Sequence, residues 1–152
     1  MVPILGIAQD LDTLADLLLV ESMKLEEAQT ILSKSQFDKI QFKKTFNAFA
    51  DNIYYTDPDR ANVYLGGGAT PKHVQSIAYL YRNDILDNIE ALQAEVSFLL
   101  KEQKNGNSSE STDDLRQYIN KGKESMIKYL ELVPPGEMKA AREILLNKSS
   151  NA

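Results

Sequence analysis

Apolar residues recur every three or four positions over long stretches of this chain, and this spacing is typical of amphipathic α-helices. The longest stretch covers residues 70–103, where Thr70 suits the N-cap and Pro71 the first helical position. Its opposite face is mostly charged or amide-bearing. A helix this long with one apolar face needs partner helices. The apolar face consists of Val74, Ile77, Ala78, Tyr81, Ile85, Ile89, Leu92, Val96 and Leu99.

Four more segments carry the helical spacing. Four of the five phenylalanines lie in one of them, at 37–55, and an aromatic stripe at this spacing is more often core than a cofactor site. Pro134 and Pro135 end the next-to-last segment. We predict one all-α domain over 1–152, an up-down-up-down four-helix bundle with a short extra C-terminal helix. The helices are expected at about 10–33, 37–55, 70–103, 112–132 and 136–147.

Both ends of the chain are predicted to be irregular. Pro3 and Gly6 interrupt the start, so residues 1–6 are expected to be a lead-in without regular structure. Residues 148–152 are expected to fray. The stretch 17–20 is apolar nearly all round, which predicts burial on two sides of the first helix.

Two connections are expected to be long. Residues 56–69 hold an Asp57-Pro58 turn and three consecutive glycines. A loop of this length is a candidate functional surface. The glycines do not match a phosphate-binding loop, which requires a lysine and a serine or threonine directly after the last glycine and a preceding strand. Residues 105–111 are polar and are predicted to be an exposed linker.

The composition of the chain excludes several classes of function. The net charge of −5 argues against a general nucleic-acid binder, whose affinity rests on basic contacts to phosphate. The chain has no cysteine, so disulfides and thiolate chemistry are excluded. The apolar start at 2–8 is too short to cross a bilayer, so a soluble or peripheral protein without a transmembrane segment is expected.

Catalytic chemistry is not predicted. His73 is the single histidine and stands near a helix start without an arranged set of carboxylates. A bundle-core di-iron site requires two Glu-x-x-His pairs, and a serine hydrolase requires a base beside its nucleophile. We therefore expect a protein that is not an enzyme and that holds no metal or cofactor.

Tyrosine and arginine gather around the long loop and the start of the central helix. Arg82 and Arg60 are positioned in sequence to stack on these tyrosines. One interpretation is an aromatic cap that seals one end of the bundle. The other is a docking patch, because tyrosine and arginine concentrate in interface hot spots. The candidate docking residues are Arg60, Tyr64, Lys72 and Tyr79.

Three segments carry a family resemblance. They are Phe46–Ile53, Asp57–Leu65 and the run from Tyr118-Ile119 to Tyr129-Leu130. With the helix order, they resemble the PsbQ-like extrinsic proteins of photosystem II, especially the related subunits of diatoms and other red-lineage algae. The resemblance covers about two-thirds of the chain. The long first helix and the helix after Pro135 have no match in that family.

The resemblance implies a protein of the chloroplast thylakoid lumen. Such a protein docks on membrane-embedded photosystem subunits and helps to retain the ions of the oxygen-evolving centre, without chemistry of its own. The alternatives are a peripheral subunit of photosystem I and a helical adaptor or assembly factor outside photosynthesis. An enzyme or metal carrier with a polar bundle core is the least favoured, because the predicted stripes are almost wholly apolar.

Overall fold

The computed structural model describes residues 1–52, 71–107 and 112–150, apart from the side chains of 71–73 and 149. These residues contain helices and turns and no strand, so the predicted all-α class is confirmed. The elements are α1 (Val2–Leu18), α2 (Leu25–Leu32), the 3₁₀-helix η1 (Ser35–Phe37), α3 (Lys39–Ala50), α6 (Pro71–Lys104), α7 (Asp113–Glu131) and α8 (Pro135–Ser150).

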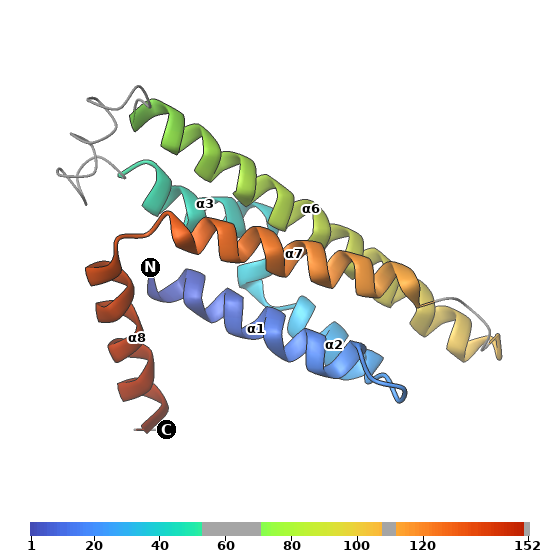
Figure 1. Ribbon diagram of the computed structural model, residues 1–152. Helices are drawn as coiled ribbons and strands as arrows, with labels where there is room; N and C mark the ends of the chain where they lie inside the picture. The colour runs from blue at the N-terminus through green and yellow to red at the C-terminus, as the bar shows by residue number, and fades with distance from the viewer. Residues whose placement is uncertain (53–70, 108–111, 151–152) are drawn as a thin grey trace.

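The long helix α6 organises the packing, as its stripe predicts. It contacts α2, α3 and α7, and α7 lies along it over most of its own length. In Figure 1, α1 and α6 run in one direction, whereas α7 and the segment from α2 through α3 run back. Helix α8 leaves this body at a steep angle beside the start of α1 (Figure 1).

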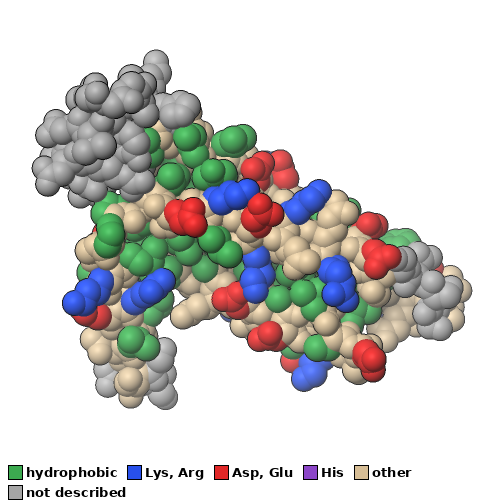
Figure 2. Space-filling model, viewed as in Figure 1, with side chains coloured by type: hydrophobic (Ala, Val, Ile, Leu, Met, Phe, Trp, Pro, Cys, Tyr) green, Lys and Arg blue, Asp and Glu red, His purple; other side chains and the backbone are tan. Residues whose placement is uncertain are grey.

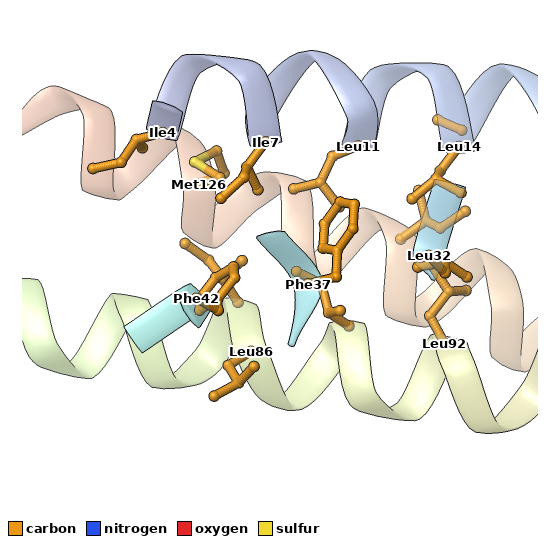
Figure 3. Close-up of a cluster of buried hydrophobic side chains, with 14 of the residues drawn as sticks. Ile4, Ile7, Leu11, Leu14, Leu32, Phe37, Phe42, Leu86, Leu92 and Met126 are labelled. Atoms are coloured by element: carbon orange, nitrogen blue, oxygen red, sulfur yellow. The ribbon is translucent and has the colours of Figure 1, made fainter. Parts of the chain in front are cut away.

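The core lies between α1, α6 and α7, and the residues from α2 to α3 close its remaining side. Figure 3 shows its side chains pointing toward one another, with Phe37 reaching toward Leu11 and Phe42 lying near Leu86. All four phenylalanines of the segment 37–55 are buried, as predicted. The core holds no buried polar or charged residue among those described. Apolar burial is therefore the main force that assembles these helices.

The predicted irregular lead-in at residues 1–6 is wrong, because α1 begins at Val2. Pro3 lies in the first helical turn, where a missing N–H leaves no hydrogen bond unmade. Ile4 and Ile7 are almost completely buried, and their burial outweighs the cost of one glycine in a helix. Tertiary packing thus extends the helix through residues that locally disfavour it.

The predicted continuous helix at 10–33 is also wrong. The chain leaves α1 after Leu18 and re-enters a helix at Leu25, and the Lys24 amide donates to the Leu17 carbonyl at 3.0 Å across the break. The break lets α2 pack against both α1 and α6. Burial on two sides at 17–20 holds only in part, since Leu18 is buried but Val20 is half exposed.

The second helix, predicted at 37–55, begins two residues later in the structure, at Lys39. Phe37 ends η1, and Asp38 then caps α3 by accepting from the amides of Ile40 and Gln41 at 3.1 and 3.2 Å. Helix α3 ends at Ala50, and Asp51 and Asn52 form a turn, so the predicted continuation of the helix is wrong at these two residues. The predicted residues 53–55 of this helix, and the loop 56–69 with its turn and glycines, lie outside the described residues.

The helices predicted at 70–103 and 112–132 are confirmed within one or two residues at their described ends. The Thr70 cap lies outside the described residues. The apolar spacing of residues 112–132 predicts Ile127 in the core, but Ile127 is 57% exposed, and Tyr129 is fully buried instead. The apolar ring of tyrosine fills the core while its hydroxyl finds an internal acceptor.

The linker and the last helix are confirmed in part. Gly106 has a φ of 81° and closes α6, which explains a glycine there. Linker residues 108–111 lie outside the described residues. The predicted helix at 136–147 is present. Residues from 148 onward were expected to fray, but α8 remains helical up to Ser150, so this prediction is wrong for residues 148–150. Residues 151 and 152 are not described.

Gly122 is expected to be a position where alanine stabilises the protein. It is buried in the middle of α7, and a Cβ there would meet the Asn88 Cβ at 3.6 Å, an ordinary van der Waals distance. Gly122→Ala should therefore raise the free energy of unfolding by about 0.5–1 kcal/mol, the helix-propensity difference. Urea denaturation measures it. Gly122→Leu is the control and should destabilise by about 1–3 kcal/mol through overpacking; an alanine variant as unstable as the leucine variant would contradict the packing.

Candidate functional site

A cluster of polar and aromatic side chains ties the end of α3 to the first third of α6. We call it the α3–α6 clasp, and it consists of Asn47, Asp51, Tyr79 and Arg82. The Tyr79 hydroxyl donates to the Asp51 carboxylate, and the Arg82 guanidinium donates to the Asn47 side-chain oxygen. The side-chain amide of Gln75 donates a further hydrogen bond of 3.1 Å to the backbone carbonyl of Ala50. The clasp fixes the residues on both flanks of the segment 53–70.

Arg82 also contacts the ring of Tyr79. Its guanidinium carbon lies 5.0 Å from the ring centroid, within the range of a cation–π contact. A bond of 2.8 Å to the Asn83 side-chain oxygen helps to hold the guanidinium in place. The predicted stacking of Arg82 on a tyrosine is therefore confirmed, and the partner is Tyr79.

Beneath the clasp, Tyr129 of α7 forms the floor. Its hydroxyl donates to the Phe46 carbonyl at 2.8 Å, and its ring meets Phe46 and Phe49 edge-on at 4.8 and 5.8 Å between centroids. Burial raises the pKa of Tyr129 well above its usual value, so the hydroxyl stays protonated. These contacts of Tyr129 hold α3 against α7.

The structure places one of the four predicted docking residues in full. Tyr79 is half-buried at the surface, and its hydroxyl and ring already have partners within the chain. Lys72 lies in the first turn of α6, and its side chain is not described. Arg60 and Tyr64 lie outside the described residues. Their grouping into one surface therefore stays a prediction.

Two members of the clasp were not found by sequence reasoning. Asn47 lies in the last turn of α3 and Asp51 directly follows the helix, and neither belongs to a recognisable motif. A signal was available: both lie on polar positions at the end of an otherwise aromatic helix, which predicts a polar contact at the edge of the core.

Sequence reasoning also missed a cavity of about 470 Å³ between α2, η1 and α6. Ser33, Ser35 and Gln93 line it, and an ion pair of 3.2 Å between Lys39 and Glu90 lies at its edge. Its volume is in the range of ligand pockets. Residues at the junction of α2, η1 and α3 form one wall of this cavity, and a predicted joint between two helices does not by itself indicate such a space.

The described residues offer no group of three or more His, Asp or Glu side chains that could hold a metal ion. Nor does a described helix combine the length and apolar character needed to cross a membrane.

The hydrogen bond to Asp51 raises the pKa of Tyr79, and burial and the negative charge of Asp51 raise it further, against the opposing effect of Arg82. The arrangement can present an aromatic and cationic surface, which is suited to binding a protein partner.

Tyr79→Phe is expected to lower the free energy of unfolding by roughly 1 kcal/mol at neutral pH, since the lost bond to a carboxylate is partly exposed to solvent. The pKa of Tyr79 in the folded protein lies above the usual tyrosine value of about 10. The bond's contribution is therefore complete below about pH 10 and disappears as the pH rises through the folded pKa. Urea unfolding of both proteins between about pH 7 and pH 11 measures this. A difference that stays constant across this range would show that the bond is absent.

Comparison with protein-family models, curated proteins and solved structures gave no match. The resemblance to PsbQ-like proteins thus rests on the residues quoted above.

Proposed function

We propose that the chain is a non-enzymatic peripheral subunit of a photosynthetic membrane complex, docked at the lumenal side of photosystem II and stabilising the oxygen-evolving centre. The resemblance to PsbQ-like proteins suggests this setting. The structural observation that carries the docking part is the α3–α6 clasp. It fixes the residues on both flanks of the segment 53–70, the stretch of sequence that holds Arg60 and Tyr64.

The proposal includes a four-helix bundle in which α1, α6 and α7 are three members and the α2–η1–α3 segment is the broken fourth. A bundle of this kind presents a rigid end. Rigid elements lower the entropic cost of ordering a docking surface. In this scheme the clasp supports the docking segment, and α8 is an addition outside the four members.

Arginine and tyrosine suit such a surface for different reasons. The Arg60 guanidinium can bind a partner carboxylate with two parallel hydrogen bonds. Tyr64 can bury its ring while its hydroxyl stays in contact with water. The chain carries a net charge of −5, so its attraction to an acidic lumenal surface depends on local basic residues such as Arg60 and Lys72. Salt screens that attraction.

The double substitution Arg60→Ala and Tyr64→Ala is expected to weaken rebinding to salt-washed photosystem II membranes by more than about tenfold, or ~1.4 kcal/mol. The helical circular dichroism spectrum should not change. Binding is measured by co-sedimentation over a range of protein concentrations. The matched control, Ser108→Ala with Ser109→Ala, should rebind like the parent. Rebinding of the Arg60 and Tyr64 variant at the parent affinity would place the docking surface elsewhere.

A further inference from the structure

The bundle leaves an apolar groove open between α1 and α7. Its cavity is about 300 Å³, and we call it the α1–α7 groove, lined by Ala8, Leu11, Met126, Ile127 and Leu130. Ile127 is 57% exposed at its edge. Figure 2 shows hydrophobic side chains between α1 and α7 and at the corner where α8 leaves the bundle. Ile127 is contiguous with the apolar lining of the groove, and a contiguous exposed apolar surface is suited to binding another protein surface.

The second feature is the distal part of α8, residues 144–150, which we call the α8 arm. Ile144, Leu145 and Leu146 are consecutive, so they point in directions about 100° apart and make one turn apolar around most of its circumference. Ile144 is 47% exposed and Leu146 is 68% exposed. In Figure 1 this part of α8 extends past the start of α1. A helical turn that is apolar on several sides is typical of a buried segment.

We propose that the α8 arm of one molecule binds in the α1–α7 groove of a second copy, and that the second arm and groove do the same in return. The chain itself carries both halves of this contact, which makes it self-complementary. Two reciprocal contacts related by a twofold axis form a closed dimer. This interface lies apart from the α3–α6 clasp and is independent of the photosystem proposal.

The first half of α8 is packed against the rest of the chain, and this packing disfavours binding of the arm in the groove of its own chain. Ala141 is buried, Met138 packs against the core, and α8 contacts α1. Folding α8 back along α7 would pull both side chains out of these contacts. Pro134 and Pro135 also restrict the backbone at the junction. A second copy meets the arm without disturbing the first half of α8.

The charges agree with this pairing. At the groove, Lys123 and Asp12 form an ion pair of 2.8 Å. The exposed residues Arg142 and Glu143 precede the arm and bring one charge of each sign to this edge. No excess of like charge opposes the approach. Because each arm contributes only about two turns, the dimer should be weak, with dissociation in the micromolar to millimolar range.

The first test is sedimentation velocity of the full chain from about 10 µM to about 1 mM. The mass should rise from that of one chain toward that of two. Ile127→Asp in the groove and the pair Ile144→Asp with Leu146→Asp in the arm should each hold the protein at one chain over the whole range. All these positions are exposed, so circular dichroism should stay helical. The control Ile40→Asp, at an exposed site on α3, should dimerise like the parent.

Cysteine cross-linking identifies the contact directly, since the chain has no cysteine of its own. A chain with Ile127→Cys and another with Leu146→Cys should form a mixed disulfide on mild oxidation, several-fold faster than Ile40→Cys with Leu146→Cys. A mixed product no faster than this control would overturn the proposal, as would a parent that stays monomeric to about 1 mM. Rapid intrachain cross-linking of an Ile127→Cys and Leu146→Cys double variant in dilute solution would show fold-back and overturn it too.

Discussion

Ile85→Asp or Ile89→Asp should abolish cooperative folding. Both side chains are 1% exposed or less at the centre of α6, where α6 packs against the rest of the core. An unpaired carboxylate at such a site must be desolvated or protonated, and either costs several kcal/mol. That is comparable to the whole stability of a domain, about 5–15 kcal/mol. Thermal melting followed by far-ultraviolet circular dichroism should show no cooperative transition.

The matched control for this prediction is Ile40→Asp. Ile40 is 79% exposed in the first turn of α3, and an acidic residue near a helix N-terminus interacts favourably with the helix dipole. The control should melt at or slightly above the parent temperature. Cooperative melting of the Ile85 or Ile89 variant near that temperature would mean that the buried face of α6 is assigned incorrectly.

Phe46→Ala is expected to cost about 3–5 kcal/mol of stability, the usual range for deleting a buried aromatic ring. Phe46 stacks on Phe42 at 4.4 Å between centroids and meets Tyr129 edge-on. Removing its ring leaves a cavity at the place where α3, α6 and α7 join. Chemical denaturation measures the loss. Phe98→Ala, at a 45% exposed site on α6, is the control and should cost less than about 1 kcal/mol; equal losses would contradict a core centred on Phe46.

The sequence is most informative where one helix face is strictly apolar. On α6 the spacing from Val74 to Leu99 predicts both the bounds and the buried side, because no competing local signal interrupts it. It is least informative at the start of the chain. There Pro3 and Gly6 locally disfavour a helix, and the helix forms because it buries Ile4 and Ile7 in the core.

The break between α1 and α2 and the face of α7 show the same limit. In the turn at 21–24, Met23 stands at helical spacing among polar residues, so periodicity alone does not reveal the break. On α7, Ile127 and Tyr129 compete for the core, and hydrophobicity favours the wrong one. Tyr129 is buried because its hydroxyl reaches the Phe46 carbonyl, a contact between residues far apart in sequence.

The candidate site was predictable to a similar degree. Tyrosine and arginine near the start of α6 indicated the contact between Tyr79 and Arg82. Asp51 and Asn47 were not indicated, since a single polar residue at a helix end has many possible partners. Their pairing depends on how α3 lies against α6.

The proposed role as a peripheral subunit of photosystem II can be tested on native complexes, separated from gently solubilised membranes of the source cells and measured by quantitative mass spectrometry. We expect the chain to co-migrate with photosystem II in a fixed ratio to its reaction-centre subunits at low salt. A high-salt wash should release it, as expected for a contact that depends on charge. Co-migration with photosystem I, or with no chlorophyll-binding complex at all, would contradict the claim.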